Sequence, residues 1–203
     1  MSTIRRTGAV ITAAGMSTRM GDFKQTLPFA GMTIVEFVVT HFMNVGVSEI
    51  AVVAGYKAGD VRECLEGYPV TILENRDYAT TQMFDSVKIG LNYIMDKCDR
   101  CFLTPVDVPA FDERTLIAEL SAGEKLVYPV TDGMTGHPIL FDSSLIPSIL
   151  AFDGDGGLRG AFESLEVSPC LLDVGDALSL LDADTPEDYR KILELYEQKT
   201  KKG

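Results

Sequence analysis

The stretch AVITAAGMSTRMGDFK, residues 9–24, decides the fold. It opens with a short apolar, β-branched run, which predicts a buried strand, and continues into a loop of small residues. Residues 13–15 are small enough for the backbone to approach a ligand, so that its N–H groups can face phosphate oxygens. Arg19 and Lys24 add a forked donor and a point charge, the two cations suited to phosphate. The stretch predicts a phosphate-binding loop, with a plain strand-to-helix turn as the alternative.

Two familiar nucleotide-binding patterns do not fit this loop. In the Walker A pattern four residues separate the two glycines, and a lysine directly follows the second glycine. Here five residues separate Gly15 from Gly21, and Asp22 follows. The dinucleotide pattern G-x-G-x-x-G fails because Ser17 and Met20 stand where glycines are needed. A nicotinamide-dependent oxidoreductase is therefore disfavoured, as it is by the lack of an acidic residue ending the second predicted strand.

Beyond the loop, short β-branched runs alternate with amphipathic segments. This alternation is typical of an α/β fold with a mainly parallel central sheet between layers of helices. Strands are expected at residues 9–12, 49–54, 70–73, 101–104, 126–128 and 138–141. Helices are expected at residues 33–43, 59–65, 84–97, 113–121 and 143–150, with a last helix after the cap Thr185. The length of 203 residues and the lack of a linker predict a single domain over residues 1–203, with a frayed tail at 199–203.

Composition excludes several classes of protein. The chain is 46% hydrophobic and 24% charged, as in ordinary globular proteins, and its formal net charge of −12 with no basic stripe disfavours a nucleic-acid partner. No apolar run approaches the roughly 20 residues of a membrane helix, and the first apolar run is too short for a signal peptide. A cytoplasmic protein without a membrane partner is expected. The motif CDRC at residues 98–101 lacks the second pair that a zinc site needs.

Carboxylates stand where a parallel sheet would place a ligand. Asp107, in the motif PVDVP, follows an apolar predicted strand, and carboxylates at strand ends suit Mg²⁺. It lies too far upstream to cap the helix that begins near Asp112. The motif DADTPEDY, residues 182–189, offers a second carboxylate in Asp184, although these acidic residues also favour a helix N-terminus electrostatically. Ser86 begins an amphipathic helix, where it can read a base edge or act as a cap.

The chain resembles MobA-like nucleotidyltransferases. Residues 13–31, AAGMSTRMGDFKQTLPFAG, match the family pattern A-A-G-x-S-x-R-M-G-x-x-K followed by Leu-Pro and Gly. Further similar stretches follow in order: NRDYATTQMFDSVKIGL (75–91), PVDVP (105–109), GHPILF (136–141), GDGGLRGAF (154–162) and DADTPEDY (182–189). The resemblance is closest to molybdenum-cofactor cytidylyltransferases, which transfer CMP from CTP to molybdopterin. The guanylyl branch usually has glycine where this chain has Ala14.

The resemblance implies a fold and a set of site residues. The fold is a three-layer, Rossmann-like nucleotide-diphospho-sugar transferase fold of the GT-A type. The nucleotide-binding residues would be Ala13, Ala14, Gly15, Ser17, Arg19, Lys24 and Ser86; the catalytic ones Arg19, Lys24 and Asp107; the Mg²⁺ ligands Asp107 and Asp184; and the acceptor-side ones His137 and Arg159. A packed His137 and a surface turn around Arg159 are the alternatives. Val106 departs from the small residue that the family often has before the aspartate, which leaves the specificity open.

The implied reaction is nucleotidyl transfer. A phosphate oxygen of the acceptor would attack the α-phosphorus of a nucleoside triphosphate, CTP being favoured, and expel pyrophosphate, with Mg²⁺ as the cofactor. The acceptor would be a phosphorylated small molecule such as molybdopterin; the alternative is a sugar or polyol phosphate with CTP or another triphosphate. The resemblance also suggests a transient contact with a molybdoenzyme or a cofactor carrier. A catalytically silent nucleotide-binding module is disfavoured by the joint presence of Arg19, Lys24, Asp107 and Asp184.

Overall fold

The computed structural model describes residues 5–201 of the chain. Its centre is an eight-stranded sheet with the order β10-β7-β9-β6-β1-β4-β5, and β8 pairs with β7 beside this path. The strands are β1 (Thr7–Ala13), β4 (Glu49–Ala54), β5 (Thr71–Glu74), β6 (Arg100–Pro105), β7 (Leu126–Thr131), β8 (Met134–Thr135), β9 (Ile139–Asp142) and β10 (Cys170–Asp173). All pairs are parallel except those that involve β8 or β9. The predicted mainly parallel sheet is confirmed.

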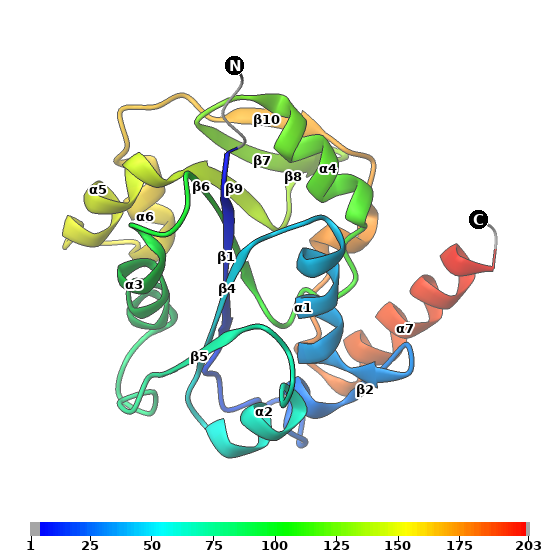
Figure 1. The fold of residues 1–203 in the computed structure, drawn as a ribbon. Helices are drawn as coiled ribbons and strands as arrows, with labels where there is room; N and C mark the ends of the chain where they lie inside the picture. Colours follow the sequence, from blue (N-terminus) through cyan, green and yellow to red (C-terminus); the bar gives the residue numbers. More distant parts are fainter. Residues whose placement is uncertain (1–4, 202–203) are drawn as a thin grey trace.

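Helices cover both faces of the sheet and complete three layers (Figure 1). One face carries α1 (Ile34–Asn44), α2 (Ala58–Cys64), α4 (Glu113–Ala122) and α7 (Pro186–Thr200), and the other carries α3 (Met83–Ile94), α5 (Ile146–Ala151) and α6 (Gly157–Glu163). Each face has its own apolar core. Val38 and Ile192 belong to the first, and Leu91 and Phe162 to the second. Strand residues of β1 alternate between the two cores, which explains its continuous apolar sequence.

The α3 helix packs closely against β1 because each element has a glycine at the contact. A Cβ atom at Gly90 of α3 would lie 2.4 Å from Val10 Cγ1, and one at Gly8 of β1 would lie 2.5 Å from Ile94 Cδ1. Real Cβ contacts are not that short, so only glycine allows this approach. The close packing fixes the first turn of α3, and with it Ser86, against the carboxyl end of the sheet.

Several short elements are not predicted by the sequence. They include the hairpin β2 (Pro28–Phe29) and β3 (Met32–Thr33), the strands β8 and β10, and α6, which lies where a surface turn around Arg159 was one of two alternatives. The region expected as a helix at 143–150 starts with the 3₁₀ turn η2 (Ser143–Leu145) before α5, and α3 ends three residues earlier than expected, at Ile94. All of these differences concern ends or pieces of a few residues, whose formation depends on tertiary neighbours.

The C-terminal helix differs from the frayed tail expected at 199–203. It continues to Thr200. The ammonium of Lys199 lies 3.1 Å from a carboxylate oxygen of Asp112 and 3.1 Å from one of Asp176, so the last turn is tied to the start of α4. Residues 202–203 lie outside the described chain.

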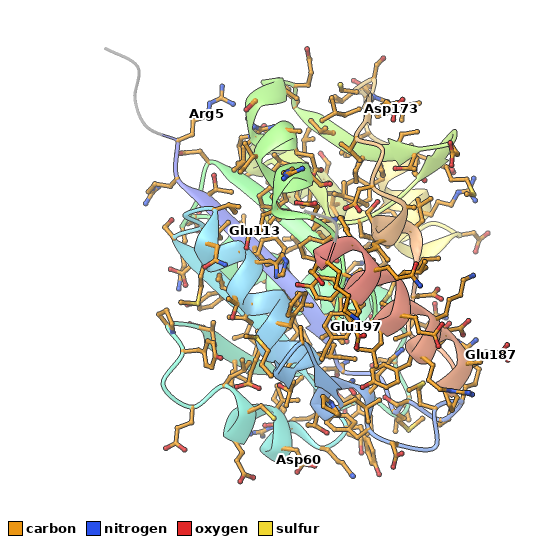
Figure 2. All side chains as sticks on the ribbon, turned by 90° about the vertical axis from the view of Figure 1, so that its right-hand side faces the viewer. Arg5, Asp60, Glu113, Asp173, Glu187 and Glu197 are labelled. Carbon is orange, nitrogen blue, oxygen red and sulfur yellow. The ribbon has the colours of Figure 1, made fainter. Side chains whose placement is uncertain are left out.

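Acidic residues outnumber basic ones, 30 to 18, which gives the net charge of −12. Exposed acidic side chains such as Asp60, Asp173, Glu187 and Glu197 lie on well-separated parts of the molecule (Figure 2). Within residues 5–201 no helix is both long and apolar enough to cross a membrane.

Candidate active site

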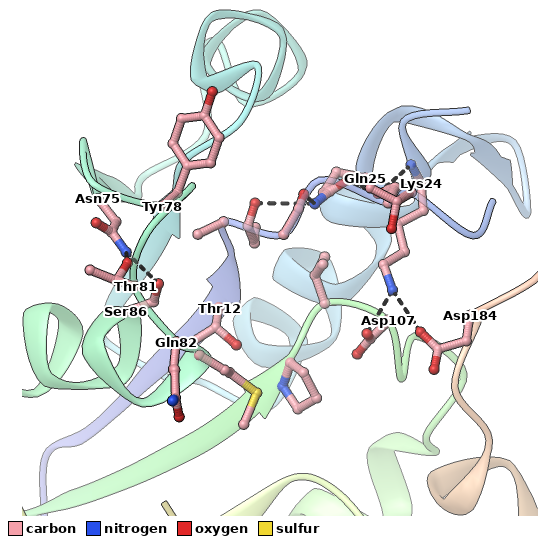
Figure 3. Close-up of a pocket in the computed structure, with 18 of the residues that line it drawn as sticks. Thr12, Lys24, Gln25, Asn75, Tyr78, Thr81, Gln82, Ser86, Asp107 and Asp184 are labelled. Atoms are coloured by element: carbon pink, nitrogen blue, oxygen red, sulfur yellow. Dashed lines mark hydrogen bonds and ion pairs between the residues drawn. The ribbon is translucent and has the colours of Figure 1, made fainter. Parts of the chain in front are cut away.

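A cavity of about 300 Å³ opens at the carboxyl ends of β1 and β6, the edge where parallel α/β sheets bind ligands. Its walls come from the loop after β1, the segment between β5 and α3, and the turn after β6 (Figure 3). The lining includes nine residues predicted from the sequence, namely Ala13, Ala14, Gly15, Ser17, Arg19, Lys24, Ser86, Asp107 and Asp184. The structure thus brings together every predicted nucleotide and metal residue, although they are spread over most of the chain.

The loop after β1 is held by a network of side-chain hydrogen bonds. Gln25, in the 3₁₀ turn η1 (Lys24–Thr26), is fully buried, and its Nε2 donates to the carbonyls of Ala13 and Gly15, each at 3.1 Å. Ser17 adopts a left-handed φ of 53°; its Oγ donates to Gln25 Oε1 at 3.1 Å and accepts the N–H of Lys24 at 3.2 Å. These bonds join the start and the end of the loop. The backbone conformation of the loop is therefore fixed by these side-chain hydrogen bonds.

Lys24 stands between two carboxylates at the centre of the site. Its Nζ lies 2.7 Å from Asp107 Oδ2 and 3.3 Å from Asp184 Oδ1, and its side chain is only 9% exposed (Figure 3). A lysine this deeply buried is rare unless it is paired, and two carboxylates supply the pairing here. Both aspartates are 24% exposed and line the cavity.

The two aspartates reach this point from different segments joined by the main chain. The N–H of Ala183 donates to the carbonyl of Asp107 at 2.7 Å, which holds the segment before α7 beside the turn after β6. Arg19 approaches from the solvent side, with Nη2 2.8 Å from Asp184 Oδ2 and 69% of its side chain exposed. Burial raises the pKa of Asp182, and the nearby carboxylates of Asp184 and Asp107 raise it further. The pocket therefore contains two carboxylates, Asp107 and Asp184, which are matched by two cations, Lys24 and Arg19.

The far end of the cavity presents hydroxyl groups arranged by one amide. Asn75 follows β5 directly and is 4% exposed; its Nδ2 donates to Thr81 Oγ1 at 2.9 Å and to Ser86 Oγ at 3.0 Å. Its Oδ1 accepts the N–H of Asp77 at 3.1 Å. Asn75 occupies an acceptor position on each hydroxyl. The Thr81 hydroxyl donates its own proton to the carbonyl of Asp77 at 2.9 Å, so within residues 5–201 Ser86 is the one of the two that keeps its proton for a ligand. Ser86 is not the cap of α3, since Gln82 takes that position.

The two residues predicted for the acceptor side do not line this cavity. Arg159 lies in α6 and forms an exposed ion pair with Glu163 at 2.7 Å. His137 precedes β9, and its Nδ1 is buried without a hydrogen-bond partner in residues 5–201. Burial lowers the pKa of His137, whereas the charge of Asp107 acts in the opposite direction. A role for either residue toward the acceptor stays a prediction.

Sequence reasoning missed three residues that shape the site. Gln25 and Asn75 were not predicted, and neither was Gly55, where a Cβ would lie 2.8 Å from the carbonyl oxygen of Ala14 and 2.7 Å from Tyr78 Cβ. Asn75 had a usable signal, because it stands at the end of a predicted strand, where ligands bind in such sheets. Gln25 had none beyond its place next to Lys24.

The site offers oxygen ligands for a divalent cation, but few of them. Asp107 and Asp184 both lie within hydrogen-bond range of one ammonium, so two hard carboxylate donors converge on one point. Within residues 5–201 no group of three or more His, Cys, Asp or Glu side chains is arranged to hold a metal. Such a donor set fits Mg²⁺ or Mn²⁺, which complete their coordination with water and substrate phosphates.

Comparisons with known proteins show which family and which relatives the chain resembles. The family model described as the MobA-like NTP transferase domain matches residues 9–169. The molybdenum cofactor cytidylyltransferase of Escherichia coli is 30% identical over 190 residues, which cover 92% of this chain and 95% of that protein. The nicotine blue oxidoreductase of Paenarthrobacter nicotinovorans is 26% identical over 200 residues, covering 91% and 95%.

One solved structure resembles the whole fold and contains a metal. It is a Mycobacterium tuberculosis protein in complex with manganese, which matches with a TM-score of 0.74 and 25% identity over 94% of this chain and 98% of that one. The three-layer, Rossmann-like fold predicted from the sequence is thus shared with solved structures.

Proposed function

We infer the function from one premise: the chain belongs to the MobA-like NTP transferase family. It is a nucleotidyltransferase, and we propose that it transfers CMP from CTP to a phosphate-bearing acceptor such as molybdopterin, releasing pyrophosphate. The observation that carries the proposal is the convergence of Lys24, Asp107 and Asp184 at the end of a loop lined by small residues. The cytidylyl specificity is supported by Ala14 and by the similarity to a cytidylyltransferase that spans nearly the whole chain.

The reaction needs positioning and charge neutralisation more than proton transfer. A phosphate oxygen of the acceptor is already anionic, so it can attack the α-phosphorus in line without a general base. Lys24 and Arg19 can donate to the oxygens that gain negative charge, and the loop N–H groups can bind the remaining phosphates. The paired aspartates hold both cations at the cavity until phosphates compete for them.

We further propose that Asp107 and Asp184 bind Mg²⁺ or Mn²⁺. The proposal is supported by two carboxylates that converge on one point and by a structurally similar protein that was solved with manganese. The bound ion would supply positive charge beside the phosphates. Asp107 and Asp184 would fix its place relative to the loop, since their segments are joined through the Ala183 N–H.

The test is a screen for pyrophosphate release. The enzyme is incubated with each of the four nucleoside triphosphates, Mg²⁺, and a panel of acceptors that includes molybdopterin, sugar phosphates and polyol phosphates. We expect CTP with molybdopterin to react fastest. A faster reaction with a sugar or polyol phosphate would show that the proposed acceptor is wrong. A faster reaction with another triphosphate would show that the proposed base is wrong.

Two controls decide between enzyme classes. Lys24→Ala should retain its circular dichroism spectrum but lose about a hundredfold or more in rate, since one charge-stabilising donor contributes that much. Because one full-length relative is named an oxidoreductase, oxidation of NADH and NADPH is followed in parallel. Nicotinamide oxidation without pyrophosphate release would refute the proposed transfer.

A further inference from the structure

Gln25 is a buried polar side chain whose donors are both used on the backbone of the loop. It has no exposed surface, and its Nε2 donates to two carbonyls, those of Ala13 and Gly15. Its Oε1 accepts a bond from Ser17. A primary amide has two N–H donors, so both are committed to these two carbonyl oxygens.

The two bonds determine where the loop N–H groups point. Peptide units are planar, and the only cis bond in residues 5–201 is His137–Pro138, so the loop units are trans. In a trans unit the N–H points opposite to the carbonyl. With the carbonyls of Ala13 and Gly15 turned toward Gln25, the N–H groups of Ala14 and Met16 point away from it.

Both N–H groups are without an intramolecular partner. Within residues 5–201 neither the N–H of Ala14 nor that of Met16 donates a hydrogen bond to the protein. Ala14 and Gly15 both line the cavity. Unpaired backbone donors that share a direction form an anion-binding site, and the small neighbours Ala14 and Gly15 leave room for a phosphate.

We propose that Gln25 is a positioning residue that turns the N–H groups of the loop toward the phosphates of the substrate. This inference rests on the proposed function, since it assumes that the cavity binds a nucleotide. Ala13 is also held by its pairing with Ala54 of β4, whereas Gly15 lies beyond the strand, so the orientation of the Gly15 carbonyl depends most on the Gln25 amide. A carbonyl oxygen that turned into the cavity would repel a phosphate, whereas an N–H attracts one.

The experiment measures phosphate binding separately from base binding. Isothermal titration with inorganic pyrophosphate, CTP and cytidine, each with Mg²⁺, is performed on the wild type, Gln25→Met, Gln25→Glu and Lys24→Ala. Gln25→Met keeps the side-chain length but removes both donors, and Gln25→Glu places an acceptor against two carbonyls. Thr26→Val is the matched control, because Thr26 bonds only to the carbonyl of Phe23.

We expect both Gln25 variants to lower the affinity for pyrophosphate and for CTP by about tenfold or more, which corresponds to the loss of roughly one charge-assisted hydrogen bond. The affinity for cytidine should not change. Circular dichroism and thermal melting identify a variant that fails to fold. In that case the binding data of the other Gln25 variant test the positioning role. Pyrophosphate affinity equal to that of the wild type, or an equal loss for cytidine and pyrophosphate, would overturn the role of Gln25.

The controls separate this inference from the proposed function. If pyrophosphate binding depends on Gln25 but the pyrophosphate-release screen with the four triphosphates shows no preference for CTP, the positioning role stands and the cytidylyl assignment fails. If Lys24→Ala lowers the affinity for pyrophosphate and Gln25→Met does not, the proposed site stands and the positioning role fails. A wild type that binds no pyrophosphate overturns both.

Discussion

The ammonium of Lys24 lies 2.7 Å from the carboxylate of Asp107, although 83 positions separate the two residues in the chain. The same ammonium reaches Asp184, so a lysine occupies the point at which two carboxylates converge. A positive charge at that point offsets their mutual repulsion. The site therefore has its own counter-cation, and under the proposed function the phosphates and a divalent ion would exchange partners with it on binding.

Asp107→Asn should reduce turnover by about a hundredfold or more. The amide keeps the size of the side chain but removes one of the two charges that would attract a divalent ion. We therefore also expect a higher Mg²⁺ concentration at half-maximal activity. Removal of metal with EDTA should abolish activity in the wild type, and added Mg²⁺ or Mn²⁺ should restore it. Asp60→Asn, on an exposed part of α2, is the control; wild-type turnover by Asp107→Asn would contradict the metal assignment.

Asn75→Ala should raise the KM for the nucleotide more than it lowers kcat. Asn75 is the donor that orients the hydroxyls of Thr81 and Ser86, and its loss leaves buried polar groups unpaired at a cost of about 1–3 kcal/mol. Pyrophosphate binding should not change, because this end of the cavity lies away from the loop. Thr80→Ala removes a hydroxyl bonded only to the Asp77 carbonyl and should behave as wild type. Weaker pyrophosphate binding in Asn75→Ala would show that the two ends are not separate.

Gly90→Ala should destabilise the protein by about 1–3 kcal/mol, as overpacking in cores does. The added methyl would lie 2.4 Å from Val10 Cγ1 and 3.1 Å from Val53 Cγ2, so α3 must move away from the sheet. Gly59→Ala in α2 meets nothing within 4 Å and should be neutral or slightly stabilising, by up to about 1 kcal/mol. Urea unfolding of both variants measures the difference. Equal stability of the two would mean that α3 adjusts freely.

Glu119 should make stability depend on pH. It is fully buried in α4, neither oxygen has a hydrogen-bond partner in the described chain, and burial raises its pKa well above 4.5, with Arg100 acting in the opposite direction. The folded state thus binds the proton more tightly than the unfolded state. Its contribution to stability is complete below about pH 4.5 and is lost as the pH rises through the raised folded pKa.

Glu119→Gln tests this dependence because it cannot ionise. The unfolding free energy of the variant minus that of the wild type should be larger at pH 8 than at pH 5, as measured by urea denaturation at both values. A difference between the two proteins that is the same at pH 5 and pH 8 would show that Glu119 does not titrate in this range.

The sequence predicts the longer elements and the site because both depend on local signals. The apolar run of β4 and the capping sequence at Thr185 are enough to place β4 and the start of α7. By contrast, β10 has Leu171 62% exposed and exists through pairing with β7, a neighbour far away in the chain. The α6 helix begins at two glycines with positive φ, and burial of Phe162 overrides that poor local propensity.

The residues of the site that were missed share a physical reason. Gln25 bonds to backbone carbonyls, which every residue has, so no pattern of side chains reveals its role. Lys24, Arg19 and Asp107 were predicted because their charge types match phosphate and metal, and their roles stay predictions. Charge complementarity can be read from a sequence, but the orientation of a peptide unit cannot.

The hydrogen bond from the Ala183 N–H to the Asp107 carbonyl has an evolutionary consequence. It is a main-chain bond, so substitutions of side chains at either position leave it in place. The spacing of the two acidic segments is therefore insulated from changes in the surrounding walls. A protein built in this way can acquire new acceptors by changing the residues around the pocket while the charged centre keeps its geometry.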